Sequence, residues 1–228
     1  MIKIFITGTD TDIGKTYVST KILQYYSQKG LRTLGMKPVA TGCYMYNDRW
    51  FNKDAELLLQ ESLIKVDYSQ VNPFSFRDAV SPNIADKAKI LTSQRIYNEY
   101  KILLNNKPEV LLVEGVGGWS VPINDKETMA DFVRLTKLGV IIVVGMKLGC
   151  LNHAILTVNN IRAQKVKILG WVANCVMPEM EALNENISTL KSFLNIPFLG
   201  RINFEESIGE GTELAKTLNG FGKARFTT

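Results

Sequence analysis

Nine residues near the amino terminus, Gly8–Thr16 with the sequence GTDTDIGKT, decide the fold of this chain. An apolar run, Ile2–Ile6, precedes them, and a segment with helical spacing of apolar residues, Thr16–Lys29, follows. A glycine-rich turn between a strand and a helix is the setting in which backbone amides and a helix amino terminus bind phosphate. The stretch therefore predicts a nucleotide-binding loop.

The side chains at the end of this loop indicate the chemistry of the ligand. Lys15 is expected to neutralise the β and γ phosphates of ATP, and the Thr16 hydroxyl is expected to coordinate the Mg²⁺ that bridges them. A helix cap is the alternative interpretation of Thr16. Gly8 and Gly14 permit backbone geometry that other residues resist. The loop predicts an enzyme that consumes ATP and requires Mg²⁺.

Two features of the loop are unusual. Five residues rather than four separate Gly8 from the Gly-Lys-Thr sequence. Asp10 and Asp12 also place carboxylates beside the expected phosphates, which they would repel unless they point away, hold water and metal, or bind a cationic group. A substrate that carries amines would account for them.

Apolar runs rich in Val and Ile recur along the chain and alternate with helical patterns, as in parallel sheets covered on both faces. The expected strands are Ile2–Ile6, Thr33–Val39, Val110–Val113, Val140–Val144, Ile168–Val172 and Pro197–Ile202. The expected helices are Thr16–Lys29, Ser93–Leu104, Thr128–Lys137, Asn152–Gln164 and Ala182–Leu194. We predict an α/β, P-loop NTPase-like fold that forms a single domain over residues 1–228, with a mostly parallel sheet and a candidate irregular tail at 219–228.

Composition and charge fit a soluble enzyme of the cytoplasm. The net charge of +5 is spread along the 228 residues rather than gathered in a basic stripe with aromatics, so we expect no nucleic-acid partner. The longest apolar run, Leu138–Met146, is shorter than the ~20 residues that a membrane helix needs, so we expect no membrane partner. The three cysteines have neither disulfide nor zinc spacing.

Three charged residues outside the loop are candidates for the same site. Glu114 follows a buried strand and precedes a glycine-rich turn, where a second metal ligand is expected, although a surface residue is the alternative. Asp54, in the irregular stretch 41–76, is either a metal ligand or a helix cap. Lys37 ends the expected second strand and faces the same crevice, unless it is an ordinary solvated lysine.

The chain resembles the dethiobiotin synthetase family from Lys3 to about Phe204. The resemblance rests, in order, on GTDTDIGKT, GMKPVATG, NKDAELL, VNPFSF followed by Ser81 and Pro82, VEGVGGW, VVGMKLGCLNHA and GWVAN. It implies that 7,8-diaminononanoate takes up CO₂ on one amine as a carbamate. ATP then phosphorylates the carbamate to a carbamic-phosphoric anhydride, and the second amine closes the ring of dethiobiotin.

The resemblance also implies roles for the charged residues. Thr16, Asp54 and Glu114 hold Mg²⁺ in the family pattern. Lys15 and Lys37 stabilise the carbamate and the transferring phosphoryl group. Because positioning and charge neutralisation carry phosphoryl transfer, two lysines and a metal ion suffice without a side-chain nucleophile.

Substrate and nucleotide contacts follow from the same resemblance. Thr11, which is also counted among the catalytic residues, and Thr41 contact the diamino end of the substrate. The amides at Cys150, Leu151 and Asn152 receive its carboxylate from the neighbouring subunit of a homodimer. The implied nucleotide contacts are Asp12, Ile13, Gly14, Lys15, Thr16, Tyr17, Asp54, Glu114, Gly115, Val116, Gly117, Asn174, Cys175, Asn203, Phe204, Glu205 and Glu210.

Two other functions remain alternatives at the level of sequence. One is the ATP domain of an amide-forming ligase, although such ligases usually carry a glutaminase domain, and this chain has a single histidine and no matching cysteine nucleophile. The other is a partitioning-type ATPase switch that binds DNA or a membrane. That class usually has a second lysine near the start of the loop, where this chain has Thr9 and Asp10.

Overall fold

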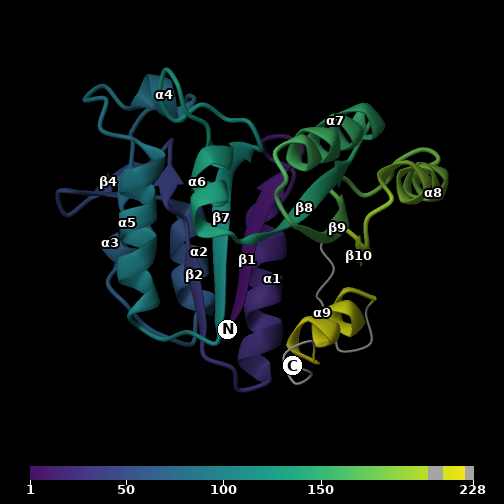
Figure 1. Cartoon of the computed structure of the whole chain (residues 1–228), viewed down its shortest axis with the longest axis horizontal. Coiled ribbons are helices and arrows are strands. Elements are labelled where there is room, and N and C mark those ends of the chain that lie inside the picture. Colours follow the sequence, from purple (N-terminus) through teal and green to yellow (C-terminus); the bar gives the residue numbers. More distant parts are fainter. Residues whose placement is uncertain (205–212, 224–228) are drawn as a thin grey trace.

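The structure is a computed structural model that describes residues 1–204 and 213–223. A twisted sheet runs through the centre of the molecule, with helices on both of its faces (Figure 1). Its six strands are all parallel and lie in the order β10-β9-β8-β1-β7-β2. They are β1 (Ile2–Gly8), β2 (Thr33–Met36), β7 (Val110–Gly118), β8 (Gly139–Met146), β9 (Ile168–Cys175) and β10 (Phe198–Ile202).

Each face of the sheet carries its own layer of helices, because successive strand side chains point to opposite faces. Ile4 and Ile6 of β1 pack against one layer, and Phe5 packs against the other. The first layer contains α1 (Lys15–Gln28), α2 (Lys53–Glu61) and α9 (Glu213–Lys223). The second contains α5 (Ser93–Leu104), α6 (Met129–Thr136), α7 (Cys150–Ala163) and α8 (Leu183–Leu194).

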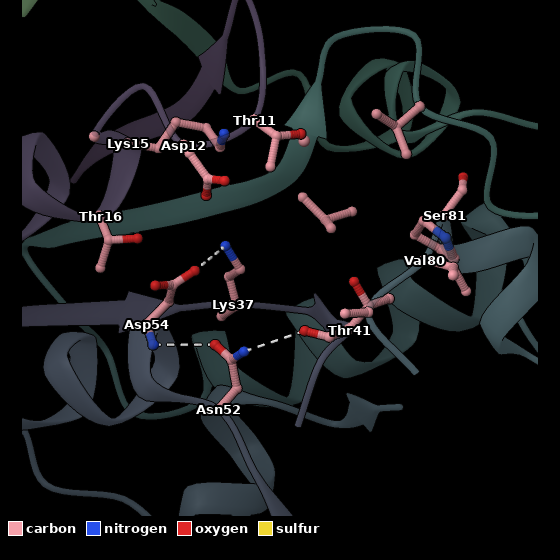
Figure 2. Close-up of a pocket in the computed structure, with 16 residues that line it drawn as sticks. Thr11, Asp12, Lys15, Thr16, Lys37, Thr41, Asn52, Asp54, Val80 and Ser81 are labelled. Carbon is pink, nitrogen blue, oxygen red and sulfur yellow. Dashed lines mark hydrogen bonds and ion pairs between the residues drawn. The ribbon is translucent and has the colours of Figure 1, made fainter. Parts of the chain in front are cut away.

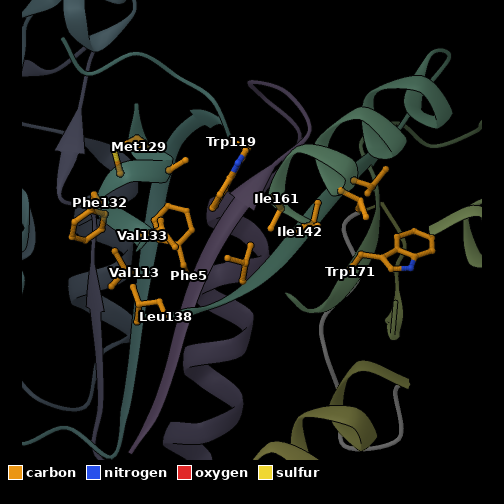
Figure 3. Packing of buried hydrophobic residues seen from close by; sticks show 14 of the residues in the cluster. Phe5, Val113, Trp119, Met129, Phe132, Val133, Leu138, Ile142, Ile161 and Trp171 are labelled. Atoms are coloured by element: carbon orange, nitrogen blue, oxygen red, sulfur yellow. The ribbon is translucent and has the colours of Figure 1, made fainter. Parts of the chain in front are cut away.

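The second layer contains Phe5, Trp119, Phe132 and Trp171 (Figure 3). Phe5 is 1% exposed and makes edge contacts with Trp119 and Phe132, at centroid distances of 6.3 and 6.4 Å. Trp171 of β9 is fully buried beneath α7 and α8. This packing holds the central strands in place, and the loops that line a cavity extend from the carboxyl ends of these strands.

A long excursion leaves the sheet after β2. It contains the short strands β3 (Val39–Ala40) and β6 (Phe74–Ser75), which pair with each other, and the hairpin of β4 (Tyr44–Tyr46) and β5 (Arg49–Phe51). Helices α2, α3 (Tyr68–Val71) and α4 (Pro82–Ala85) complete it. The predicted irregular stretch 41–76 therefore contains several short strands and helices.

The predicted α/β fold with a parallel sheet is confirmed, and three local predictions are corrected. The expected strand Thr33–Val39 ends at Met36, because Pro38 has no N–H for the ladder and the chain turns into β3. Strand β7 continues past Glu114 to Gly118. Residues 219–223 of the expected irregular tail belong to α9, and residues 224–228 lie outside the described part. Among the described helices none is long and apolar enough to cross a membrane.

Candidate active site

A cavity of about 840 Å³ opens at the carboxyl ends of the central strands. Figure 2 shows the phosphate loop along one side of it, the Asn52 and Thr41 segment along the other, and Lys37 between them. The described residues that line it are Thr11, Asp12, Gly14, Lys15, Thr16, Lys37, Thr41, Asn52, Asp54, Ala79, Val80, Ser81, Pro82, Val116, Gly117 and Val121.

The phosphate loop has the predicted strand-loop-helix setting. Strand β1 ends at Gly8, and α1 begins at Lys15 after Gly14, whose φ of 81° lies in the left-handed region that glycine tolerates. Gly14 rather than Thr16 is the N-cap of α1, so the alternative interpretation of Thr16 as a cap is wrong. Ile13 is fully buried beneath the loop.

The Lys15 ammonium points back into its own loop. Its Nζ donates to the carbonyl oxygen of Asp10 at 3.0 Å. Burial, and then the positive charge of Lys37, lower the pKa of Lys15 to about 8. A polyanion bound in the loop would offset both effects, as expected of a phosphate-binding lysine.

The two aspartates of the loop have different surroundings. Asp10 Oδ2 accepts from Lys147 Nζ at 2.8 Å, and Asp10 Oδ1 accepts from the Thr11 amide at 2.8 Å. The hydrogen bond from Lys147, together with that amide, lowers the pKa of Asp10. The charge of Asp10 is therefore balanced outside the phosphate cradle, by a lysine that the sequence did not single out. Asp12 is exposed and lines the cavity.

Lys37 lies at the centre of a buried ionic cluster. Its Nζ is 2.6 Å from Glu114 Oε1, 2.9 Å from Asp54 Oδ2 and 3.2 Å from the carbonyl oxygen of Gly115. Thr16 Oγ1 donates to the same Glu114 Oε1 at 2.8 Å. Lys37 is 4% exposed and Glu114 is fully buried, so the interpretations of Lys37 as a solvated lysine and of Glu114 as a surface residue are wrong.

The two acids determine the protonation of this cluster. Burial alone would lower the pKa of Lys37, but Glu114 and then Asp54 raise it above its ordinary value. Burial would raise the pKa of Asp54, but the Lys37 ammonium lowers it. The ammonium and the Asp54 carboxylate are therefore both charged near neutral pH.

The oxygens around Lys37 also fit the chemistry of Mg²⁺. Thr16, Asp54 and Glu114 supply one hydroxyl and two carboxylates, and Glu114 Oε2 is buried without a hydrogen-bond partner. The described residues contain no group of three or more His, Cys, Asp or Glu side chains suited to a metal. Mg²⁺ usually binds one or two protein carboxylates together with waters and substrate phosphates, so two acids are enough.

Asp54 faces this cluster because a neighbour caps its helix. The side chain of Asn52 accepts from the amides of Asp54 and Ala55, at 3.0 and 3.4 Å, and is the N-cap of α2. The interpretation of Asp54 as the cap is therefore wrong.

A second network, missed at the level of sequence, holds the backbone of Lys37. The buried Asn72 donates from Nδ2 to the Lys37 carbonyl oxygen at 2.6 Å, and the Lys37 amide donates to Val71 O at 2.9 Å. Tyr68 Oη donates to Asn72 Oδ1 at 2.9 Å and accepts from the Asn52 amide at 2.7 Å. One network thus supports both Lys37 and the cap of the Asp54 helix. The quoted motif VNPFSF contained Asn72, but its partner lies 35 residues away.

The predicted substrate contacts Thr11 and Thr41 both line the cavity. Beyond them its wall becomes apolar through Ala79, Val116 and Val121. The cavity therefore offers a cationic, phosphate-binding side and an apolar side to the same ligand.

The predicted base contacts lie behind the loop. Asn174, 5% exposed at the end of β9, donates from Nδ2 to Ile13 O at 2.9 Å. Gly115 contributes its carbonyl oxygen to Lys37, and Val116 and Gly117 line the cavity. Tyr17 is half-buried on α1, Cys175 ends β9, and Asn203 and Phe204 follow β10. Glu205 and Glu210 lie outside the described residues, and the nucleoside pocket stays a prediction.

The predicted carboxylate contacts form the first turn of α7, after Gly149 with a φ of 91°. The Cys150 amide already donates to Lys147 O at 3.0 Å, and the side chain of Leu148 just before it is 99% exposed. Cys150, Leu151 and Asn152 are not among the described residues that line the cavity. Their role toward a second subunit stays a prediction.

Solved structures with a similar fold include a cell division protein and an ATPase of the ParA family. The MinD cell division protein of Aquifex aeolicus matches with a TM-score of 0.57 at 15% identity, over 98% of this chain and 96% of that chain. A ParA family ATPase from Chlorobium tepidum matches with a TM-score of 0.53 at 11% identity, over 98% and 99%. At such low identity these likenesses show the fold alone, and they confirm the P-loop NTPase-like prediction.

Sequence comparisons are more specific. A family model described as "AAA domain" matches residues 3–212. The ATP-dependent dethiobiotin synthetase of Cellvibrio japonicus is 44% identical over 86% of this chain and 86% of its own length. That of Pseudoalteromonas translucida is 38% identical over 96% of both. The chain therefore belongs to the dethiobiotin synthetase family.

Proposed function

We propose that this chain catalyses the ATP-dependent conversion of 7,8-diaminononanoate and CO₂ to dethiobiotin. The observation that carries the proposal is a cavity in which a phosphate loop with Lys15 lies next to a second buried lysine, Lys37. Two cations at one site suit a reaction in which a carboxylated amine meets the γ phosphate of ATP.

The reaction runs in three steps. One amine of the substrate attacks CO₂, forming an N–C bond and losing a proton to give a carbamate. A carbamate oxygen then attacks the γ phosphorus, and ADP leaves as the P–O bond to its β phosphate breaks. Finally the second amine attacks the carbonyl carbon of the anhydride and loses a proton, the C–O bond breaks, and inorganic phosphate leaves with the former carbamate oxygen.

The residues of the cavity position the reactants and neutralise their charge. Lys15 and the amides of residues 12–17 bind the phosphates, and Lys37 holds the carbamate oxygens against the γ phosphate. Thr11 and Thr41 orient the diamino end. Thr16, Asp54 and Glu114 would hold Mg²⁺, which would supply positive charge to the phosphates of ATP.

The remaining parts of the substrates have partners in the same proposal. The apolar wall at Ala79, Val116 and Val121 suits the alkyl chain of the diamine. The first turn of α7 from the second subunit of a homodimer receives the substrate carboxylate. Asn174 and the segment after β10 contact the adenine. The three free cysteines favour a cytoplasmic location.

The test is direct. The protein is incubated with ATP, Mg²⁺, bicarbonate and 7,8-diaminononanoate while ADP release and the mass of the organic product are followed. We expect ADP release that depends on the diamine and a product with the mass of dethiobiotin. ADP release no higher than in the reaction without diamine would refute the proposal. ATP turnover that instead depends on DNA would favour the partitioning-type alternative.

A further inference from the structure

Lys37 occupies the position that a metal cation would take between the two acids of the site. Its Nζ bonds Glu114 Oε1 at 2.6 Å and Asp54 Oδ2 at 2.9 Å, and Figure 2 shows the pair with Asp54. Thr16 Oγ1 shares the Glu114 oxygen at 2.8 Å. Both carboxylates assigned to Mg²⁺ thus already bind an ammonium group, and Thr16 donates to one of them.

The ammonium and a metal ion would compete for Glu114 Oε1 and Asp54 Oδ2, the two oxygens that Lys37 contacts. Mg²⁺ binds oxygen ligands at about 2.1 Å, so an ion on Glu114 Oε1 would lie within roughly 5 Å of an ammonium bonded to the same atom. Like charges at that distance repel strongly in a site shielded from water. Glu114 is fully buried, so neither cation can be replaced there by solvent alone.

We propose that the Lys37 ammonium is a built-in counter-cation of the metal site, holding Asp54 and Glu114 in the nucleotide-free enzyme and moving away when metal binds with nucleotide. This inference rests on the proposed function, because it concerns the metal of that reaction. It gives Lys37 a second role besides its contact with the carbamate. Metal binding and the release of Lys37 from Asp54 and Glu114 would therefore occur together.

Lys37 lines the cavity of about 840 Å³, which offers space for its side chain to move while its backbone stays in place. The main chain is fixed on both sides, through the Asn72 side chain on its carbonyl and Val71 O on its amide. The other lysine of the site, Lys15, bonds a backbone carbonyl rather than a carboxylate, so it does not compete for the metal ligands.

The proposal predicts how a divalent ion binds to the full-length protein. Mn²⁺ binding is measured by electron paramagnetic resonance without nucleotide, for the wild type, Lys37→Met and Lys37→Gln. Both variants should bind Mn²⁺ about 10- to 1000-fold more tightly than the wild type, the range by which a neighbouring charge shifts the proton affinity of a carboxyl. Equal affinities would overturn the proposal.

Lys147→Met is the matched control. It also removes the lysine partner of a carboxylate in the phosphate loop, Asp10, but Lys147 makes no contact with Asp54 or Glu114 among the bonds of the described residues. Its Mn²⁺ affinity should change by less than about threefold at physiological ionic strength, because screening weakens distant charges. If Lys147→Met gains as much Mn²⁺ affinity as the Lys37 variants, the result would contradict a specific role for Lys37.

The wild type provides a test that needs no variant. Adding ADP should raise its Mn²⁺ affinity at least about tenfold, after correction for Mn²⁺ bound to free ADP, because phosphates compensate for the displaced contacts. A wild type that binds Mn²⁺ equally tightly without nucleotide would overturn the proposal even if the Lys37 variants fail to fold. Thermal unfolding of each variant with and without Mn²⁺ shows which samples are folded.

The outcome is separable from that of the proposed function. Product formation is measured on the same wild-type sample with ATP, bicarbonate, 7,8-diaminononanoate and Mg²⁺. Dethiobiotin formation together with unchanged Mn²⁺ affinity in Lys37→Met would refute the counter-cation alone. Tighter Mn²⁺ binding in Lys37→Met without any product from the wild type would refute the proposed reaction alone.

Discussion

Replacing Gly14 with alanine should break the contact between the phosphate loop and the asparagine behind it. Gly14 has a φ of 81°, and a methyl group there would overlap with Asn174 Nδ2 and lie 3.3 Å from its Cγ. Asn174 would have to move and lose its bond to Ile13 O, which is 2.9 Å long and buried. The left-handed backbone costs an alanine roughly 1–2 kcal/mol, and the broken buried bond about 1–3 kcal/mol more.

Gly30→Ala is the matched control for this prediction. Gly30 has a similar φ of 75° just after α1, but a Cβ there would meet no atom within 4 Å. Its substitution should therefore cost only the backbone term, roughly 1–2 kcal/mol. The free energies of unfolding of the two variants are compared by urea unfolding, with one shared slope for the dependence on urea concentration. ADP binding is measured for each variant.

The difference between the two variants tests the reasoning. Gly14→Ala should be less stable than Gly30→Ala by about 1–3 kcal/mol and should lose ADP binding, whereas Gly30→Ala should bind ADP normally. Asn174→Ala should lower the free energy of unfolding less in the Gly14→Ala background than in the wild type, because it removes the side chain that the new methyl group overlaps. Two variants with equal stabilities and normal ADP binding would refute the overlap with Asn174.

Three further predictions concern the lysines and their support. Lys37→Gln should lower the rate of product formation about 10²- to 10³-fold while ATP binding persists, and steady-state kinetics with near-normal rates would contradict this. The kcat/KM for ATP should fall as pH rises above about 8, since free Lys15 loses its proton there. Lys15→Arg should move that fall to higher pH, and a profile that stays flat to pH 9 in the wild type would exclude Lys15 as its cause. Asn72→Ala should lower the free energy of unfolding by about 1–3 kcal/mol, measured in urea, because the Lys37 carbonyl loses its donor, and no loss of stability would contradict that role.

Much of the fold followed from local patterns. Strands β7, β8 and β9 lie where continuous Val and Ile runs predicted them, because buried parallel strands need apolar side chains on both faces. Helix α5 spans the predicted Ser93–Leu104 without change. The break after Met36 was missed, since the apolar pattern continued across Pro38 although its backbone cannot donate to the ladder.

The sequence predicted which residue types form the site, but it predicted only some of the contacts between them. The sequence brought Lys15, Lys37, Asp54 and Glu114 to one crevice, and the cluster of buried charges agrees with that expectation. It did not predict that Lys37 would bond both acids, because the partners are 17 and 77 residues away. Such distant contacts are set by packing of the whole sheet, which local patterns do not encode.

The aspartates of the phosphate loop show the same limit. The sequence raised three explanations for their charge and could not choose among them. The structure places Lys147, 137 residues from Asp10, at 2.8 Å from its carboxylate. That ion pair supports the first explanation for Asp10, which turns away from the phosphate cradle. The lysine was visible in the motif VVGMKLGCLNHA, but its partner was not.

The transfer of one oxygen atom tests the proposed chemistry most directly. With ¹⁸O-labelled bicarbonate, ATP, Mg²⁺ and 7,8-diaminononanoate, the C–O bond of the anhydride breaks at ring closure, so the released phosphate should carry one labelled oxygen for each dethiobiotin formed. The experiment needs carbonic anhydrase-free conditions and short reaction times, because exchange with water removes the label. Unlabelled phosphate formed alongside labelled ureido product would contradict the anhydride, and phosphate release independent of the diamine would contradict the function.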